Sequence, residues 1–409
     1  MLTILDLRDT DDPQDYLHRT VQTLVEGEVV AVPTEAGYGL IAHALNGEAV
    51  EKLIRLNHQL NDRGKDDASS SGASSRDPAN SSGTENPSGT ASFSDHCSLL
   101  LPSVQAAGDY LVDWSPLVRR LAQRCWPGPL QIEANSSDSK SLTACLCGGA
   151  LSLAASSSGQ VAFRVVSHRV IEGIHRYLRG PLLFAGLNDD HGKAITTAAH
   201  AAESLIDSVP LLLDDGPTRY GGRPTSVSVE NQFFTVRHQG VIEEAAMNQI
   251  IKPVVVLVCT GNTCRSPMAE TLLRERFRVK FGREDLVRVL SAGVAAGSGY
   301  GASSQAVEVM GQRGLDLTGH SSQPLDDELI NVADVILTMT RGHRSAILAA
   351  WPELSDRVQT LRRDGGDVSD PVGMPVEVYE ACAKQIDSEL EAWIEGLDDD
   401  FFPSKLAGV

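Results

Sequence analysis

Long apolar runs, a regular cysteine pattern and an excess of basic residues are all missing from this chain of 409 residues. No apolar segment reaches the ~20 residues of a membrane-spanning helix, and Met1 to Arg8 lacks the basic start and apolar stretch of a signal peptide. The seven cysteines are odd in number and unevenly spaced, which does not suit a disulfide framework. We therefore expect a cytoplasmic protein without membrane spans.

The shortage of positive charge narrows the possible partners. With 35 Lys and Arg against 54 Asp and Glu, the formal net charge is -19. This balance argues against a general binder of nucleic acid or membrane surfaces, although a local basic groove is compatible with it. Cys145 and Cys147 form a C-x-C pair without a second pair or nearby histidines. We interpret them as structural or incidental, with a zinc site as the alternative.

The length suggests two domains, because 409 residues exceed what one ordinary hydrophobic core encloses. We place the junction within Ala246 to Lys252, which divides the chain into residues 1–250 and 251–409. Both parts alternate predicted strands with predicted helices, a pattern typical of α/β folds.

The most informative stretch is Val254 to Glu270, VVVLVCTGNTCRSPMAE. Val254 to Val258 has the length and β-branched composition of a buried strand, which ends at Cys259. From Pro267 the apolar residues recur with helical spacing, and a proline is tolerated in the first turn of a helix. The residues between them therefore form a strand-to-helix turn.

Within that turn, Cys259 and Arg265 bracket five residues, and Ser266 follows the arginine. A short loop entering a helix points backbone N–H groups inward and adds the positive end of the helix dipole, which suits a tetrahedral dianion. Gly261 and Asn262 accept left-handed backbone conformations at low cost. The same field favours Cys259 as a thiolate nucleophile, and the Arg265 fork can hold two phosphoryl oxygens.

The string CTGNTCRSPMAE resembles the active-site loop of the low-molecular-weight protein-tyrosine phosphatases. More narrowly, it resembles their bacterial protein-arginine phosphatase branch, in which threonine follows the nucleophile as Thr260 does here. The resemblance runs from about Lys252 to Leu397. It implies hydrolysis of phosphorylated protein side chains through a thiophosphate on Cys259, assisted by Arg265, without a metal or cofactor. The implied phosphate-binding loop comprises Thr260, Gly261, Asn262, Thr263, Cys264 and Ser266.

The reaction also needs a proton donor for the leaving group and then a base for water. The resemblance gives both roles to Asp370, which precedes a proline in a loop rich in Gly and Asp. Asp364 and Asp367 are nearby rivals, and from the residues alone all three are ordinary solvated loop aspartates.

Other residues of this chain match family positions that support the phosphate-binding loop. Asn262, Ser291 and His320 match the hydrogen-bonded support of the loop, and Ser266 is placed to donate to the thiolate. Capping or surface roles are the alternative for each of them. Cys264 matches a second loop cysteine that can form a reversible disulfide with the nucleophile, or it is simply packed.

The resemblance further implies a substrate preference for phosphoarginine over phosphotyrosine. Thr260 places a hydroxyl where the tyrosine-selective branch has a larger aliphatic group, while Val372 and Ala295 provide no aromatic wall. Tyr300, in a Gly-rich loop, is the residue that can restore such a wall. Arsenate reductase uses the same loop and fold, but it relies on late resolving cysteines, for which Cys382 alone in a predicted helix is a poor fit.

The rest of this half alternates further strands with helices. Strands are expected at Leu286 to Leu290, Val335 to Met339 and Val358 to Leu361, and helices at Ser303 to Arg313, Asp326 to Val332, Arg341 to Ala350 and Val376 to Leu397. This order predicts a four-stranded parallel sheet with its ligand at the carboxyl ends of the strands, where Cys259 lies.

In the first half, VVAVPTEAGYGLIAHA resembles the P-T-E-T-x-Y-G-L segment of the YrdC-type threonylcarbamoyl-adenylate synthases, which bind ATP, threonine and bicarbonate. Weaker matches in the family's order extend the resemblance over about Met1 to Ala245. It implies a twisted α/β sheet carrying a ligand site. The candidate ligand-binding residues are Thr34, Glu35, Tyr38, Arg164, Asn188, Thr225 and Arg237.

Departures from that family are as informative as the matches. Asn57-His58-Gln59 stands where the family has a K-x-R pair, so the charges that would hold a triphosphate are missing. Residues 62–95 have the composition of a disordered insertion, and residues 135–159 form a second, loose insertion rich in small residues. ATP is thus a candidate ligand, but the site lacks the charges with which the family holds the triphosphate. We therefore expect a binding or scaffold domain. The alternatives are an active synthase beside the phosphatase, or a module binding RNA or nucleotide.

Overall fold

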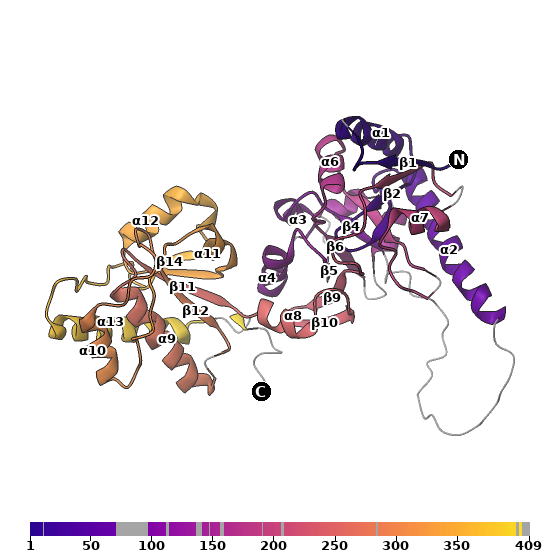
Figure 1. Ribbon diagram of the computed structural model, residues 1–409. Coiled ribbons are helices and arrows are strands. Elements are labelled where there is room, and N and C mark those ends of the chain that lie inside the picture. The colour runs from indigo at the N-terminus through magenta and orange to yellow at the C-terminus, as the bar shows by residue number, and fades with distance from the viewer. Residues whose placement is uncertain are drawn as a thin grey trace, which may run out of the picture. The chain divides into compact units, whose positions relative to one another are not determined.

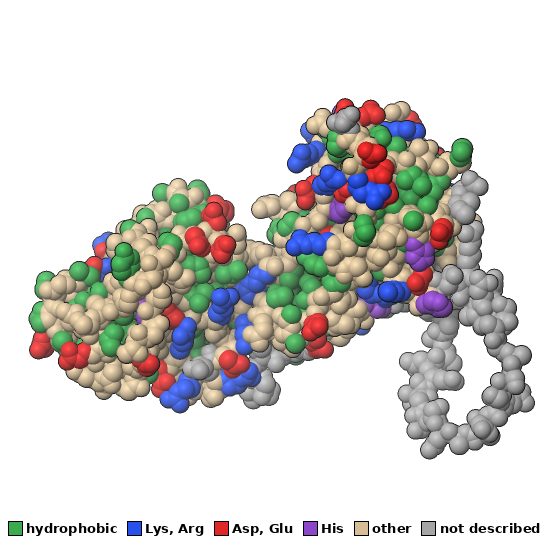
Figure 2. Space-filling model, in the orientation of Figure 1, with side chains coloured by type: hydrophobic (Ala, Val, Ile, Leu, Met, Phe, Trp, Pro, Cys, Tyr) green, Lys and Arg blue, Asp and Glu red, His purple; other side chains and the backbone are tan. Residues whose placement is uncertain are grey.

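The chain divides into two compact units, Met1–Met247 and Asn248–Val409 (Figure 1). The computed structural model describes residues 1–10, 12–70, 97–111, 114–135, 141–146, 148–155, 159–189, 191–205, 208–283, 285–397 and 401–402, with only the backbone for 61–70. None of the helices within these ranges is both long and apolar enough to cross a membrane. Figure 2 shows acidic, basic and apolar side chains intermixed on the visible face of each unit.

The first unit is built on a mixed sheet that has ten strands in the described residues, in the order β1-β8-β2-β3-β7-β4-β6-β5-β9-β10. The strands are β1 (Thr3–Asp6), β2 (Val30–Pro33), β3 (Tyr38–His43), β4 (Cys97–Leu100), β5 (Leu130–Asn135), β6 (Gln160–Arg164), β7 (Leu182–Gly186), β8 (Leu211–Asp214), β9 (Thr225–Glu230) and β10 (Phe233–His238). β1 pairs in parallel with β8, whereas β2 and β3 are antiparallel. The predicted twisted α/β sheet of this half is confirmed.

Helices accompany this sheet along the chain. They are α1 (Pro13–Val25), α2 (Gly47–Ser70), α3 (Val104–Tyr110), α4 (Pro116–Cys125), the 3-10 helix η2 (Leu142–Cys145), α5 (Gly148–Ala154), α6 (Arg169–Tyr177), α7 (Ala198–Ser204) and α8 (Glu244–Ile250). α1 begins at a proline behind Asp12, whose carboxylate accepts the N–H groups of Gln14 and Asp15. Leu17 of α1 lies against Gly173 of α6, where a Cβ atom would be only 2.5 Å from Leu17 Cδ1. Glycine thereby lets the two helices approach closely.

Two predictions for this unit need correction. α2 continues to its last residue at Ser70, so residues 62–70 are helical and not part of a disordered loop; residues 71–95 lie outside the described residues. Residues 135–159 are not wholly loose, because η2 and α5 form within them. Three apolar side chains of α5 are buried: Ala150, Leu153 and Ala154. Small residues can pack a short helix closely, and composition alone does not reveal such packing.

The second unit contains a four-stranded sheet in the described residues, in the order β12-β11-β13-β14. Its strands are β11 (Val254–Cys259), β12 (Arg288–Gly293), β13 (Val335–Thr338) and β14 (Val358–Thr360), and every neighbouring pair is parallel. The helices are α9 (Arg265–Phe281), α10 (Ser304–Gln312), α11 (Asp327–Val332), α12 (Arg341–Ala350), the 3-10 helix η3 (Pro352–Leu354) and α13 (Val376–Glu395). The predicted four-stranded parallel sheet is confirmed.

β11 is the central strand that positions the loop after it. All of its residues are buried, as expected for a strand of a parallel sheet with helices on both faces. Val254, Val256 and Val258 point to one face and pack in a core with Ile336 of β13 and Ile347 of α12. Because β11 and β13 are parallel neighbours, the loops that follow them leave the sheet at the same edge.

Candidate active site and a second pocket

Cys259, the last residue of β11, lies at the closed end of the loop that enters α9. The backbone N–H of Asn262 donates to Cys259 Sγ over 3.3 Å, and Ser266 Oγ lies 3.0 Å from the same sulfur. Both groups can stabilise negative charge on sulfur, Ser266 by rotating its hydroxyl proton away from Ala292 O, its other acceptor at 3.2 Å. This arrangement is the short loop around the cysteine that the sequence predicts.

Asn262 connects the loop to its surroundings. Its φ of 54° is left-handed, as expected for the residue type that tolerates this region best after glycine. Its side-chain amide donates to Ser266 Oγ at 3.0 Å and to Ser291 Oγ at 2.9 Å. Its carbonyl groups are also used, since Oδ1 accepts the N–H of Gln323 at 2.9 Å and the backbone O pairs with His320 Nε2 at 2.7 Å. The structure thus brings together the three predicted supporting residues.

Arg265 is buried in the first turn of α9 and faces the predicted general acid. Its Nη1 donates to Val368 O at 3.2 Å, and its Nη2 donates to Asp370 Oδ2 at 2.5 Å. The Asp370 side chain is 48% exposed, so it can reach both solvent and a bound group. The rivals are engaged elsewhere: Asp364 pairs with Arg362, and Asp367 accepts from Arg341. Of the three aspartates, only Asp370 contacts Arg265 in the described structure.

The cysteines beyond the nucleophile have separate surroundings. Cys264 precedes α9, and its Sγ lies 3.4 Å from both Tyr379 Oη and Ser303 Oγ. Cys382 is buried in α13, where its thiol contacts Ser369 O at 3.5 Å and burial raises its pKa to about 12. Cys145 is exposed in η2, and Cys147 lies outside the described residues.

Sequence reasoning missed two groups beside the loop. His343 Nε2 lies 2.9 Å from Thr260 Oγ1, although 83 residues separate them in the chain. Burial and, secondarily, the positive charge of Arg265 lower the pKa of His343. Glu270, on the second turn of α9, accepts the hydroxyl of Ser291 at 2.5 Å. A Glu after the loop motif was visible in the sequence, but its partner was not.

Comparison with known proteins agrees with this geometry. Residues 254–402 match the family model of the low molecular weight phosphotyrosine protein phosphatases. A protein-arginine-phosphatase of Geobacillus stearothermophilus is 39% identical over 147 residues, which are 35% of this chain and 95% of that protein. The chain belongs to the low molecular weight phosphotyrosine protein phosphatase family. Its second unit is accordingly a phosphatase domain of that family.

Other relatives in this phosphatase family are named for different activities. A probable low molecular weight protein-tyrosine-phosphatase of Ralstonia solanacearum is 38% identical over 146 residues, covering 36% of this chain and 95% of the relative. A protein-arginine-phosphatase of Bacillus subtilis is 40% identical over 148 residues, covering 35% of this chain and 93% of the relative. Identity of this size does not separate the two substrate types. The first unit matches a different family. Its residues 22–63 and 92–240 match the Sua5, YciO and YrdC family model, which carries the description "Telomere recombination".

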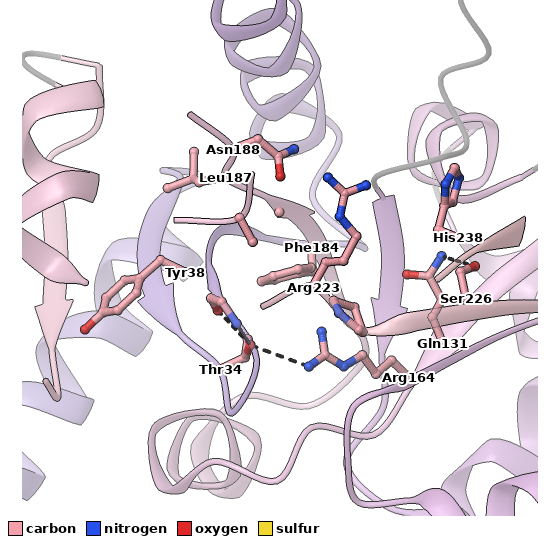
Figure 3. A pocket seen from close by; sticks show the side chains of 14 residues that line it. Thr34, Tyr38, Gln131, Arg164, Phe184, Leu187, Asn188, Arg223, Ser226 and His238 are labelled. Atoms are coloured by element: carbon pink, nitrogen blue, oxygen red, sulfur yellow. Dashed lines mark hydrogen bonds between the residues drawn. The ribbon is translucent and has the colours of Figure 1, made fainter. Parts of the chain in front are cut away.

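The YrdC-like unit has a pocket of its own (Figure 3). The pocket combines basic, amide, hydroxyl and apolar side chains. Its lining residues are Thr34, Gly37, Tyr38, Gln131, Arg164, Phe184, Gly186, Leu187, Asn188, Ala194, Arg223, Pro224, Ser226 and His238. In Figure 3 the side chains of Arg164, Arg223 and Phe184 gather in the middle of the pocket, and the Tyr38 hydroxyl is directed away from them. That hydroxyl donates to Gly216 O at 2.8 Å.

Arg164 is the most unusual residue of this pocket, because its side chain is 0% exposed. Its Nη2 pairs with Glu35 Oε1 at 2.8 Å and lies 3.5 Å from Thr34 Oγ1. Its Nε and Nη1 have no hydrogen-bond partner within the part of the chain that the structure describes. Phe184 lies beside it, with the guanidinium carbon 5.9 Å from the ring centroid. Buried donors without partners are rare in folded proteins, and here they face a pocket.

The other predicted ligand residues divide into two groups. Asn188 lines the pocket with Thr34, Tyr38 and Arg164, and Glu35 reaches it through Arg164. Thr225 and Arg237 do not line it. Thr225 Oγ1 donates to Ile242 O at 2.9 Å, while Arg237 is half-exposed with its Nε 4.0 Å from a Glu133 carboxylate oxygen. Pocket residues that the sequence did not indicate include Gln131, Phe184, Arg223, Ser226 and His238.

The segment that replaces the basic pair lies outside this pocket. Asn57 is buried, with Nδ2 4.0 Å from Cys97 Sγ, whereas His58 and Gln59 are exposed on α2. None of the three lines the pocket. The pocket's guanidinium groups are those of Arg164, which Glu35 partly neutralises, and Arg223, which donates to Gly192 O. Two arginine side chains, one of them paired with a carboxylate, thus stand among the described lining residues of this pocket.

Proposed function

We propose that the phosphatase domain hydrolyses phosphorylated protein side chains through a thiophosphate on Cys259. The observation that carries this proposal is the pair of groups that meet Cys259 Sγ, Asn262 N–H and Ser266 Oγ, together with the Arg265 guanidinium that contacts Asp370. Such donors stabilise a thiolate and the negative charge of a transferring phosphoryl group. A thiolate enzyme also requires a reducing compartment, so we place the protein in the cytoplasm.

The two chemical steps use the same carboxyl group. Cys259 sulfur attacks phosphorus, the bond from phosphorus to the leaving nitrogen or oxygen breaks, and protonated Asp370 donates its proton to that atom. Asp370, now a carboxylate, takes a proton from water as the water oxygen attacks phosphorus and the sulfur–phosphorus bond breaks. Phosphate leaves and Cys259 returns to the thiolate. Arg265 Nη2 donates to Asp370 Oδ2 in this structure. For Arg265 Nη2 to bind the phosphoryl group of the substrate, it has to release Asp370.

The variant Cys259→Ser tests the nucleophile. We expect loss of turnover with retained folding, because a hydroxyl of high pKa replaces the thiol at a site of nearly the same size. Cys382→Ala is the matched control, since this thiol is buried in the same unit and has no role in the proposed steps. Near-wild-type turnover by Cys259→Ser, with the control equally active, contradicts the mechanism.

We further propose phosphoarginine as the better substrate. Thr260 is exposed beside the nucleophile, where its hydroxyl can hydrogen-bond a guanidinium group. Val372 is 62% exposed on the loop after the general acid, so that wall lacks an aromatic ring, whose stacking contributes ~1 kcal/mol. Tyr300 is 65% exposed, and its ring lies over Gly297, where a Cβ atom would be 2.6 Å from Cε2.

Substrate choice is tested by Thr260→Ile on phosphoarginine and phosphotyrosine peptides of one sequence. We expect the ratio of kcat/KM values to shift toward phosphotyrosine, because the polar contact is lost and apolar surface is gained. Tyr300→Ala is the companion variant, and a selective loss with phosphotyrosine identifies Tyr300 as an aromatic wall. An unchanged ratio in Thr260→Ile means that selectivity is set elsewhere. Arsenate reduction is the weaker reading, since a resolving cysteine needs an accessible thiolate and Cys382 is buried with a raised pKa.

For the YrdC-like unit, we propose a binding module for a small anion of carboxylate or bicarbonate size, without useful synthesis of threonylcarbamoyl-adenylate. The buried Arg164, with two unpartnered nitrogens at the pocket, supports this role. Arginine carries a permanent positive charge, and a bound anion would satisfy its free donors. Of the two arginines that line the pocket in the described part of the chain, Arg164 is paired with Glu35 and Arg223 donates to Gly192 O, which leaves little positive charge for tight binding of the triphosphate of ATP.

Calorimetric titration of the full chain with bicarbonate, threonine, ATP and a short RNA compares these ligands. We expect a small anion to bind and Arg223→Gln to weaken it, whereas Arg237→Gln, a variant of an arginine outside the pocket, leaves binding as it is. Robust pyrophosphate release from ATP, threonine and bicarbonate shows an active synthase instead. Binding of RNA alone favours the nucleic-acid module and contradicts the small-anion proposal.

A further inference from the structure

His343 lies beside the nucleophile loop but makes none of the contacts proposed for catalysis. It sits in the first turn of α12, where its backbone N–H donates to Thr340 Oγ1 at 3.2 Å. Its side chain is buried, with 7% of the residue exposed, and its Nε2 lies 2.9 Å from Thr260 Oγ1. Thr260 itself is exposed. One end of this pair is therefore anchored in the protein, and the other is exposed at the residue that follows Cys259.

The surroundings of His343 determine which atom carries the proton. Its Nδ1 is buried and has no hydrogen-bond partner among the described residues. Nδ1 lacks a partner among the described residues in both neutral tautomers, but a proton on Nδ1 would be a buried N–H donor without an acceptor, whereas a proton on Nε2 is shared with Thr260 Oγ1. This difference favours the Nε2–H tautomer, in which Thr260 Oγ1 accepts the hydrogen bond. Burial and Arg265 keep the imidazole neutral by lowering its pKa, while Asp370 and Asp367 act in the opposite sense.

A threonine hydroxyl without such a partner can occupy more than one χ1 rotamer. With His343 Nε2–H donating to it, Oγ1 is held in one position, its own proton points away from His343, and a second lone pair stays free. That oxygen can then accept an N–H from a guanidinium leaving group or donate to a phosphoryl oxygen. A phenyl leaving group offers no N–H, so it gains less from the same oxygen.

We propose that His343 is a positioning residue that holds the Thr260 hydroxyl toward the substrate and thereby favours phosphorylated guanidinium groups over phosphorylated phenols. This inference rests on the proposed phosphatase function. It assigns a role to His343, which lies in the helix after β13, whereas the nucleophile loop follows β11. The pair forms because the loops after the parallel neighbours β11 and β13 leave the sheet at one edge.

The test is a double-mutant cycle between the two positions, with His343→Leu, Thr260→Val and the double variant assayed on phosphoarginine and phosphotyrosine peptides. We expect His343→Leu to lower kcat/KM for phosphoarginine about 10-fold, as for one lost hydrogen bond in the transition state, and for phosphotyrosine less than about threefold. In the Thr260→Val background His343→Leu should have little further effect. His343→Gln is the matched control, because its amide can place a donor near the position of Nε2, and it should retain most of the selectivity.

Additive losses in the cycle, or equal losses on both substrates, overturn the proposal, because a merely structural histidine affects both substrates alike. Nitrogen NMR of the His343 ring gives a readout without turnover: we expect the Nε2–H tautomer in the wild type and a changed Nε2 signal in Thr260→Val. A wild-type Nδ1–H tautomer also contradicts the proposal. If the wild type prefers phosphotyrosine, the proposed substrate preference fails, and non-additivity with the expected tautomer still supports the positioning role.

Discussion

Replacing Asn262 tests whether the hydrogen bonds around the nucleophile loop stabilise the phosphatase domain. Its side chain is fully buried and makes three hydrogen bonds, to Ser266, to Ser291 and from the N–H of Gln323. Its backbone φ is 54°, which most residue types adopt only at a cost. Asn262→Ala removes the three bonds and places a poorly suited residue in the left-handed region. Asn262→Gly removes the same bonds and accepts that region.

The expected magnitudes follow from these contacts. At about 1 kcal/mol for each hydrogen bond, the loss common to both variants is roughly 3 kcal/mol. Alanine adds about 1 to 2 kcal/mol for the left-handed backbone. Glycine avoids that term, but its greater freedom in the unfolded chain costs roughly 0.5 to 1 kcal/mol. We therefore expect Asn262→Ala to lose about 4 to 5 kcal/mol and Asn262→Gly about 3.5 to 4 kcal/mol.

Hydrogen exchange of the β11 and β12 amides in the full chain measures these losses within the phosphatase domain alone. A loss of 3 kcal/mol raises the exchange rate roughly 100-fold, since 1.4 kcal/mol corresponds to a factor of ten. The β2 and β3 amides of the YrdC-like unit serve as the internal control and should exchange as in the wild type. A loss below about 1 kcal/mol in both variants refutes the reasoning about the network. A stable glycine variant beside an unstable alanine variant means that the backbone conformation, and not the hydrogen bonds, sets the requirement.

Three further outcomes can be measured. Asp370→Asn should slow hydrolysis of substrates with poor leaving groups by about 100-fold or more and of activated phenyl phosphates far less, because only the former need the proton; a larger effect of Asp364→Asn or Asp367→Asn contradicts this role. In mass-spectrometric mapping at pH 7.5, iodoacetamide should modify Cys259 well before Cys382, whose pKa burial raises to about 12, and equal rates would show that Cys382 is accessible as a thiolate. Burial lowers the pKa of His175 to about 4. Between about pH 4 and pH 6.5 the unfolded chain therefore binds more protons than the folded chain. The resulting stability is complete above pH 6.5 and is lost toward pH 4, by roughly 3 kcal/mol at most, and His175→Leu should flatten this pH dependence in denaturation of the full chain.

The sequence by itself was sufficient for the nucleophile loop, because its chemistry is local. Strand, turn and helix follow one another within Val254 to Glu270. The β-branched run predicts the strand, Gly261-Asn262 predicts the turn and the apolar spacing predicts the helix, and none of these predictions depends on distant contacts. The alternation of strands and helices likewise predicted the parallel sheet. The choice of Asp370 among three neighbouring aspartates came from family resemblance, and the contact with Arg265 is what distinguishes it physically.

In the YrdC-like unit the sequence identified residues but not their orientation. Thr34, Tyr38, Arg164 and Asn188 line the pocket, while Thr225 turns its hydroxyl to the backbone of Ile242 instead. Neighbouring residues of a strand face opposite sides of its sheet, so a shift of one position separates a pocket residue, such as Ser226, from one that is not. The helix α5 was missed for a related reason, since burial of small side chains depends on what lies against them.

Only the tertiary structure paired His343 with Thr260, Ser291 with Glu270, and Arg164 with Glu35. Each pair joins residues far apart in the chain or on elements whose order in the sheet the sequence does not state. Local patterns specify where a strand or helix begins and which face is apolar, because those depend on neighbouring residues. Which polar side chains meet at the edge of a sheet depends on strand order and register, and these are set by the packing of the whole core.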